Sequence, residues 1–223
     1  MKVINFFGAP GAGKSTAALG LAYQMKRCWL RAELVTEVAK DYVWRDSTHM
    51  LAHQNLIMAQ QDERLSILDG KADVVVSDSP LLLSALYAPR EFPASFYPFV
   101  FEMFERFDNI NFLIDRSHEY TAIGRVQSES ESDVVAQILP YFLSDNGVPF
   151  YRLPASDATP VRLLMWLHQH GHVRIRQDIL ETVLLPQVPE IPWAEPQLIL
   201  PPEDVRTDET MSRRRLPESV PTT

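Results

Sequence analysis

Short apolar runs alternate with longer segments of helical spacing along the first 185 residues. Five runs have the length and uninterrupted apolar character of strands that are buried on both faces. They are Lys2–Phe7, Ala32–Thr36, Asp73–Ser77, Asn111–Asp115 and Phe150–Leu153. Helical spacing between them predicts helices at Ser15–Trp29, His49–Leu68, Phe96–Phe107, Glu129–Leu143 and Thr159–His170. This alternation is typical of a three-layer α/β fold with a mainly parallel, here five-stranded, sheet.

The composition changes near the C-terminus. Eight of the 17 prolines lie after residue 185, and acidic residues at 203–209 are followed by the basic run Arg213–Arg215 without an apolar period. Such a composition favours an extended or disordered segment. We therefore expect a folded domain at residues 1–171 and a Pro-rich extension at 172–223 that is disordered in part. Both a solvated tail and a partner-docking arm remain open for that extension.

Composition narrows the class of protein. The chain has 223 residues, 46% of them hydrophobic, and a single cysteine, so it can bury one sizeable core but cannot form an intrachain disulfide. The longest apolar runs, such as Pro80–Ala88, are far shorter than the ~20 residues of a membrane span. The net charge of −8 provides no general basic field for nucleic acid. We expect a soluble, cytoplasmic protein with no membrane partner.

A glycine-rich motif follows the first predicted strand directly. Residues 8–15 read GAPGAGKS, which matches G-x-x-x-x-G-K-[ST] and leads into a predicted helix. Glycines let backbone N–H groups close around phosphates, Lys14 reaches the β and γ oxygens, and the Ser15 hydroxyl can ligate magnesium. The motif predicts an ATP-binding loop. Its residues are Gly8, Ala9, Pro10, Gly11, Ala12, Gly13, Lys14, Ser15 and Thr16.

A carboxylate is expected at the tip of a neighbouring strand, where it meets the magnesium ion or its water. Asp78 occupies such a place, because it ends the run Val74–Ser77 just before Ser79 and Pro80. A strand-end aspartate can also be a helix cap. Beside a phosphate-binding loop we predict that Asp78, with Ser15, holds Mg²⁺.

Several segments together resemble a known family. They are residues 8–15, 35–40 (VTEVAK), 60–64 (QQDER), 78–80 (DSP) and 124–129 (GRVQSE). In this order and spacing they make residues 1–170 similar to the small P-loop kinases that act on nucleosides, nucleotides and ribosylnicotinamide. The similarity is greatest to phage-encoded relatives, including kinases that phosphorylate 5-hydroxymethyluracil in DNA. It implies ATP, Mg²⁺, a hydroxyl-bearing acceptor and, for a phage-encoded protein, the host cytoplasm.

The resemblance also implies roles around the acceptor. Glu37 follows the second predicted strand and is the better candidate for the general base, because Asp78 is expected to be occupied with magnesium. Gln60 and Arg64 lie four residues apart, share a helix face and could read a base edge or a phosphate. Tyr42 and Trp44 could stack on a ring. A capping or solvated role remains open for Glu37, and an ordinary polar surface for Gln60 and Arg64.

Two arginines resemble the mobile cations of the kinase lid. Arg116 follows the fourth predicted strand, and Arg125 follows Gly124 before the next helix. We expect both to neutralise charge on the transferring phosphoryl group, with surface salt bridges as the alternative. The His168, His170 and His172 group lacks the acidic or cysteine partners of a metal site, so we expect it to be solvated. Cys28 is expected to serve packing.

Three functions follow from these motifs. The first is ATP-dependent phosphoryl transfer to a hydroxyl group, with the hydroxymethyl group of 5-hydroxymethyluracil in DNA as the first candidate and a free nucleoside or nucleotide as the alternative. The second is a P-loop ATPase that acts as a switch or assembly factor. The third, a nucleotide-binding regulator without turnover, conflicts with the intact Lys14, Ser15 and Asp78. Neither the acceptor nor the oligomeric state follows from the sequence.

Overall fold

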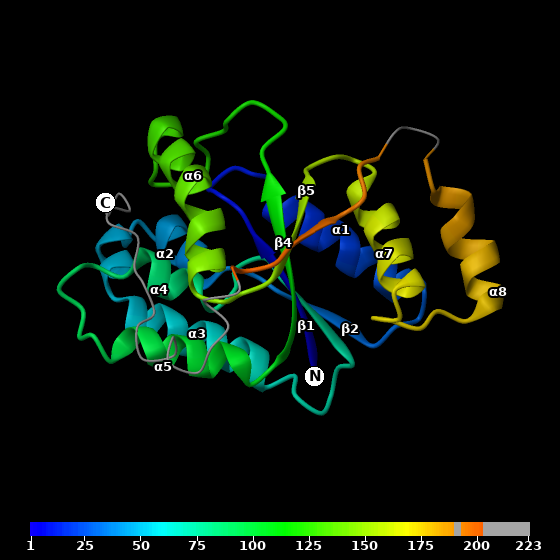
Figure 1. Ribbon diagram of the computed structural model, residues 1–223, viewed down its shortest axis with the longest axis horizontal. Helices are drawn as coiled ribbons and strands as arrows, with labels where there is room; N and C mark the ends of the chain where they lie inside the picture. The colour runs from blue at the N-terminus through cyan, green and yellow to red at the C-terminus, as the bar shows by residue number, and fades with distance from the viewer. Residues whose placement is uncertain (190–192, 203–223) are drawn as a thin grey trace.

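The computed structural model describes residues 1–189 and 193–202 of the chain. A six-stranded sheet in the order β2-β3-β1-β4-β5-β6 forms the middle of the molecule (Figure 1). Its strands are β1 (Lys2–Phe7), β2 (Ala32–Val35), β3 (Val74–Ser77), β4 (Asp108–Asp115), β5 (Phe150–Pro154) and β6 (Gln197–Ile199). All neighbouring pairs are parallel except β5 and β6, which are antiparallel. The three-layer, mainly parallel α/β prediction is thus confirmed.

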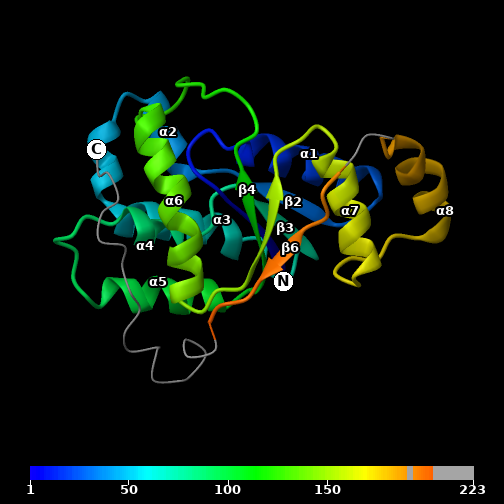
Figure 2. The ribbon, with the colours of Figure 1, turned by 45° about the horizontal axis from the view of Figure 1, so that its top comes forward.

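Helices cover both faces of the sheet (Figure 2). One face packs on α1 (Lys14–Arg27) and α7 (Thr159–Gln169). The other packs on α3 (Gln54–Ser66), α4 (Leu83–Tyr87), α5 (Phe96–Glu105) and α6 (Glu129–Asp145). Helix α2 (Val38–Trp44) and the 3₁₀ turn η1 (Thr48–Ala52) lie between β2 and α3. Three short consecutive helical segments follow α7, namely α8 (Gln177–Ile179), η2 (Leu180–Leu184) and η3 (Leu185–Gln187).

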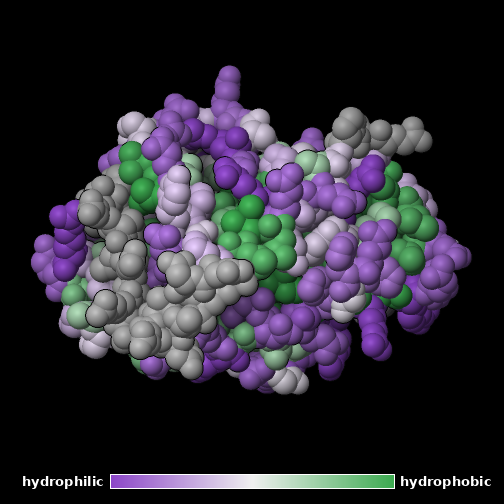
Figure 3. Space-filling view, in the orientation of Figure 1, coloured by the Kyte–Doolittle hydropathy of each residue, from purple (hydrophilic) through white to green (hydrophobic). Residues whose placement is uncertain are grey.

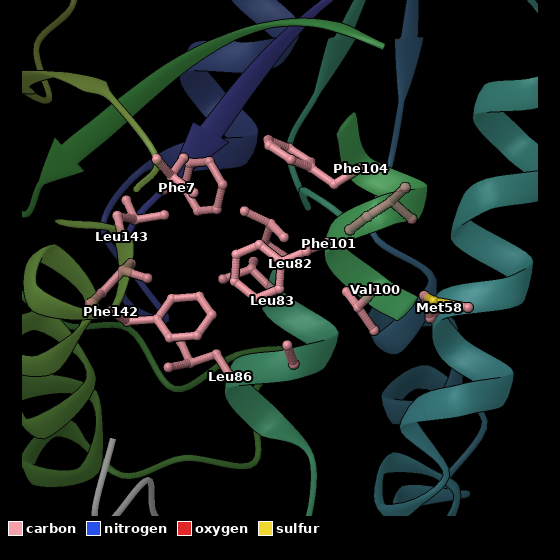
Figure 4. Packing of buried hydrophobic residues seen from close by; sticks show 14 of the residues in the cluster. Phe7, Met58, Leu82, Leu83, Leu86, Val100, Phe101, Phe104, Phe142 and Leu143 are labelled. Atoms are coloured by element: carbon pink, nitrogen blue, oxygen red, sulfur yellow. The ribbon is translucent and has the colours of Figure 1, made fainter. Parts of the chain in front are cut away.

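The alternation of side chains along β1 divides the core into two clusters. Val3 and Phe7 point into the cluster beneath α3 to α6, whereas Ile4 and Phe6 point into the cluster beneath α1 and α7. Figure 4 shows the first cluster, where Phe7 lies among side chains from α3, α4, α5 and α6. Truncating a buried phenylalanine of this kind costs about 3–5 kcal/mol. The two clusters fix β1, and therefore the loop that follows it.

Strand β4 begins three residues before its predicted start. Asp108 and Asn109 are polar and were expected to lie outside the sheet. A side-chain ladder explains their place: Asn5 Nδ2 donates to Asn109 Oδ1 at 2.8 Å and to Asn111 Oδ1 at 3.0 Å. These bonds satisfy polar groups that would otherwise be costly to bury in the sheet.

The predicted helix His49–Leu68 is divided at His53, whose ψ of 64° lies outside the helical region. The break separates η1 from α3, and Gln54 at the start of α3 donates from Nε2 to the Leu51 carbonyl at 2.8 Å. The short helices α2 and α4 were not predicted, because they have only seven and five residues.

The sixth strand comes from the region expected to be an extension. Residues 197–199 form β6 at the sheet edge, with Pro196 and Pro201 close to its ends. An edge strand tolerates prolines that a central strand would not. The remainder of that region, at 190–192 and 203–223, lies outside the described residues. The face in Figure 3 is largely hydrophilic, with apolar patches near its centre and towards one end.

Two minor predictions concern residues far from the glycine-rich loop. His170 and His172 stack on the Trp166 ring at centroid distances of 4.2 and 5.6 Å, so the histidine group packs on an aromatic ring as well as facing solvent. Cys28 is buried in the cluster beneath α1 and α7. No helix among the described residues is both long and apolar enough to cross a membrane.

Candidate functional site

The glycine-rich loop joins β1 to α1 and has a backbone that other residues cannot easily adopt. Gly8 has a φ of +153°, and a Cβ there would lie 2.8 Å from the Ile114 carbonyl oxygen of β4. Gly13 has a φ of +94° directly before the first residue of α1. The loop therefore places the N-terminus of α1 and its free backbone N–H groups at the carboxyl end of the sheet.

Lys14 lies at the centre of the site. Its Nζ donates to the carbonyls of Gly8 at 2.8 Å and Ala9 at 3.1 Å, so the side chain folds back over the loop. Burial lowers the pKa of Lys14, and the carboxylates of Glu37 and Asp78 oppose that shift. The ammonium is therefore enclosed, with two acidic side chains as its nearest compensating charges.

Asp78 follows β3 and is buried at the same edge of the sheet. Its backbone N–H donates to Val35 at the end of β2 at 3.2 Å. Burial raises the pKa of Asp78, while a hydrogen bond from the Ser15 hydroxyl and the charge of Lys14 lower it. Among the described residues, Asp78 Oδ1 has no hydrogen-bond partner. A hydroxyl beside a carboxylate with a free, buried oxygen fits the oxygen donors that Mg²⁺ prefers.

Glu37 ends the turn that leads from β2 into α2. It is half-buried, and its backbone N–H is hydrogen-bonded to Asp78. Burial raises the pKa of Glu37, Lys14 lowers it, and Asp78 raises it further. The Tyr87 hydroxyl lies close enough to Glu37 that the carboxylate, together with burial, raises the pKa of the phenol. The three side chains predicted to carry catalysis on this side, Lys14, Glu37 and Asp78, are therefore together.

A cavity of about 290 Å³ opens over these groups. The glycine-rich loop forms one wall, and segment 118–127 forms another. Beyond Glu37 the cavity continues between α2, η1 and α4. Its side chains there are both apolar and polar, and they include Lys40, Val43, Leu51, Gln54, Leu83 and Tyr87. The cavity thus extends past the loop that would hold phosphates.

The two predicted lid arginines have different surroundings. Arg125 lines the cavity, and within the described residues it forms no salt bridge. Arg116 does not line it, because its guanidinium pairs with Asp133 and, at 3.7 Å, with Glu129 of α6. Arg125 is therefore placed to meet a ligand, whereas Arg116 is held by a helix.

Gln60 and Arg64 line a second cavity of about 180 Å³ on the other side of α2. Arg64 donates to the Thr36 carbonyl at 3.1 Å and pairs with Asp41, and Gln60 accepts from the Tyr42 hydroxyl at 2.9 Å. These bonds fasten α3 to α2. The structure does not bring either side chain to the cavity that Lys14 lines.

Tyr42 and Trp44, which were expected to stack on a ring of the acceptor, make other contacts in the structure. The Tyr42 hydroxyl bonds to Gln60, and the ring of Trp44 packs against Gly124, where a Cβ would lie 2.7 Å from Cζ2. Sequence reasoning missed Tyr87, Lys40, His118 and Tyr120. No spacing rule marks them, because they come from three separate segments of the chain: α2, α4 and the loop between β4 and α6.

These features define a class. A glycine-rich loop between β1 and α1, with a lysine over the loop and an acidic residue at the end of β3, makes the protein a P-loop NTPase domain. A family model described as an AAA domain matches residues 3–159. The chain therefore belongs to that family.

Comparison of structures agrees with this fold. The NadR protein in complex with NAD and AMP-PNP matches with a TM-score of 0.51 and 15% identity, over 79% of this chain and 51% of its own. This chain thus spans about half the length of that protein, and the likeness is one of fold. Deoxyadenosine kinase from M. mycoides, with dCMP and dCDP bound, matches at a TM-score of 0.49 and 16% identity, over 78% of this chain and 100% of its own. No curated protein sequence matches the chain.

Proposed function

We propose that the protein transfers the γ-phosphoryl group of ATP to a hydroxyl group of a nucleoside-like acceptor. The observation that carries this proposal is the position of Glu37: it lines one cavity with Lys14 and Ser15, and the cavity continues beyond it between α2, η1 and α4. A P-loop domain that only hydrolyses ATP has no need of such a space. A kinase needs it for the acceptor.

Glu37 acts on the acceptor hydroxyl in this proposal. Its carboxylate accepts the proton as the acceptor oxygen bonds to the γ-phosphorus, and the bond from that phosphorus to the β–γ bridging oxygen breaks, with ADP as the leaving group. The raised pKa of Glu37 makes its carboxylate a stronger base than an exposed glutamate. Tyr87, next to Glu37 in the cavity, can orient the same hydroxyl.

The phosphate side is held by this chain's own cations and dipoles. The N–H groups of the loop and Lys14 bind the β and γ oxygens, and Arg125 adds positive charge from the other wall. Ser15 and Asp78 would hold Mg²⁺, which when bound supplies charge neutralisation at the phosphate oxygens. With the cavity closed around them, these charges act in a medium of low dielectric constant, where they are stronger than in water.

The acceptor end favours a ring that carries a hydroxyl group. Val43, Leu51 and Leu83 offer apolar contacts, and Gln54 and Tyr87 offer polar ones. Such a wall suits a nucleoside, a nucleotide or a single base turned out of a DNA strand. The resemblance to phage kinases supports the hydroxymethyl group of 5-hydroxymethyluracil in DNA, which would have to leave the stack at a cost of a few kcal/mol.

Transfer of label from γ-labelled ATP tests the proposal. The protein with Mg²⁺ is offered nucleosides, nucleotides, ordinary DNA and DNA that contains 5-hydroxymethyluracil, in parallel. We expect label on one of the hydroxyl acceptors. Label on the modified DNA alone identifies the base kinase, and label on a free compound identifies a metabolic kinase. Release of inorganic phosphate with every acceptor unlabelled would contradict the proposal and favour the ATPase that membership of the AAA-domain family also allows.

A further inference from the structure

The segment between β4 and α6 forms one wall of the cavity without a helix or a strand of its own. It runs over residues 116–128, from the end of β4 to the first residue of α6. Tyr120 is half-buried near its middle, and its hydroxyl donates to the Gln127 carbonyl, so the side chain ties the middle of the segment to its end beside α6. A loop fixed by its own side chain can hold a residue at a set position.

The Tyr120 ring also lies against the phosphate-binding loop. A Cβ on Gly11 would meet the ring at 3.0 Å and the Arg125 guanidinium carbon at 3.6 Å. Gly11, Tyr120 and Arg125 are therefore in one layer. A side chain at position 11 would push this layer away from the loop.

Both lid arginines contact the same ring. The guanidinium of Arg116 lies over the Tyr120 ring at 5.5 Å from its centroid, and that of Arg125 lies over it at 5.6 Å. The negative face of an aromatic ring attracts a cation, by about 0.5–2 kcal/mol depending on desolvation. Since Arg116 is also paired with two carboxylates of α6, it fixes the ring, and the ring in turn positions Arg125.

Arg125 carries a donor that protein atoms do not use. Its Nη1 is buried, and no described residue accepts a hydrogen bond from it. An unpaired buried guanidinium N–H is costly, so it is expected to find an acceptor in the bound state. Because Arg125 lines the cavity beside the glycine-rich loop, a phosphate oxygen is the acceptor within reach.

We propose that Tyr120 is a positioning residue, which presets the Arg125 guanidinium over the glycine-rich loop so that it meets the terminal phosphate of the bound nucleotide. This inference rests on the proposed phosphoryl transfer. It assigns Tyr120 no contact with the reacting atoms. The ring acts only through Arg125.

The test uses Tyr120→Leu, which removes the ring, and Tyr120→Phe, which keeps it. We expect Tyr120→Leu to lower kcat/KM for ATP about tenfold, and Tyr120→Phe to restore most of that loss. Tyr23→Leu is the matched control, because Tyr23 has a similar contact with Arg27, at 5.7 Å, on α1. That control should have wild-type activity.

Two further measurements separate positioning from general stability. In a double-mutant cycle, Tyr120→Leu should add nothing to the loss caused by Arg125→Ala; losses that multiply would overturn the inference. Independently of turnover, Tyr120→Leu should weaken binding of a non-hydrolysable ATP analogue but not of ADP. Equal weakening of both nucleotides would also overturn it. A wild-type protein that labels no acceptor refutes the proposed function, while the binding ratio still decides the role of Tyr120.

Discussion

The two walls of the cavity are built in different ways. The strand-end wall comprises residues 10–16 and Glu37, with Asp78 hydrogen-bonded to Ser15 next to them, and these residues follow β1, β2 and β3 at one edge of the sheet. The lid wall comprises residues 118–127, and the segment that carries it, from Arg116 to Gln127, contains no helix or strand. The positions of the first wall's residues are set by the sheet, which is packed against a hydrophobic cluster on each face. The second depends on a few side-chain contacts.

The charged side chains of the two walls also differ in how strongly they are buried. Burial dominates the pKa shifts of Lys14, Glu37 and Asp78; Lys14 lowers the pKa of both carboxyl groups, and both carboxylates raise the pKa of Lys14. Both lid arginines are half-buried and lie over the Tyr120 ring, and Arg116 also pairs with partly exposed carboxylates of α6. Buried charges interact more strongly than exposed ones. Changes to the strand-end wall should therefore cost much more activity than changes to the lid wall.

The largest effect is expected at Lys14. Lys14→Ala removes the only charge that binds phosphate from the loop itself, and we expect phosphoryl transfer to fall on the order of 10³-fold or more. The unfolding midpoint should change little, because among the described residues Lys14 hydrogen-bonds to carbonyls of its own loop, and the cost of burying its charge offsets the attraction of Glu37 and Asp78. Lys26→Ala is the control, since that lysine lies on the same helix and pairs with Glu33 outside the site. Transfer at the wild-type rate in Lys14→Ala would remove the basis for the site.

The next effect is expected at Glu37. Glu37→Gln keeps the shape of the side chain but removes the base, so kcat should fall on the order of 10²-fold while ATP binding persists. Glu33→Gln, four residues earlier at an exposed position of β2, is the matched control and should leave kcat unchanged. Equal kcat values for Glu37→Gln and wild type would assign Glu37 a structural role. The measurement is the initial rate with the acceptor that the labelling experiment identifies.

The contrast between the walls also explains what could be predicted. Gly8 and Gly13 could be predicted because a phosphate-binding backbone requires glycine where φ is positive. Lys14 could be predicted with them, as part of the same motif. The position of Asp78 at the site could be predicted because an acidic residue at the end of a strand, beside a phosphate-binding loop, is typical of a magnesium site. The five parallel strands could be predicted from their apolar runs, which are continuous where a strand is buried on both faces, as in β1 and β3.

The remainder depends on contacts that no local pattern encodes. Tyr120 looks like any loop tyrosine until the fold places it between Gly11 and two arginines. Gln60 and Arg64 share a face, as their spacing predicts, but which cavity that face meets depends on how α2 packs on α3. Strand β6 was not predicted because it has only three residues and lies between Pro196 and Pro201.

A medium effect is expected where the lid wall meets α2, at the contact of Gly124 with Trp44. Gly124→Ala forces a Cβ to within 2.7 Å of the indole and places alanine at a φ of +72°. Gly70 has the same φ of +72° with nothing within 4 Å, so Gly70→Ala isolates the backbone strain. Both variants should lose about 1–2 kcal/mol of stability. Only Gly124→Ala should also lower kcat, by roughly threefold to tenfold, because it displaces the lid that carries Arg125.

Unfolding midpoints and initial rates of the two alanine variants provide the comparison. Equal rates in Gly124→Ala and Gly70→Ala would show that the Trp44 contact does not govern the lid. A Trp44→Ala variant then serves as a check, since it removes the clash. Combined with Gly124→Ala, it should recover the rate but not the stability lost to the positive φ.

The smallest effect is expected at Asp133, which anchors Arg116 from α6. Asp133→Asn removes one of two carboxylates from a partly exposed ion pair, and such pairs contribute about 0–1 kcal/mol. Arg116 would keep Glu129 at 3.7 Å and the Tyr120 ring, so kcat should fall only about twofold and more at low salt than at high salt. Asp73→Asn, which breaks the exposed pair with Arg31 at the start of β3, is the control and should leave kcat unchanged. A loss as large as that of Glu37→Gln would place Arg116 among the groups that contact the phosphates. The two walls would then contribute equally to the rate of phosphoryl transfer.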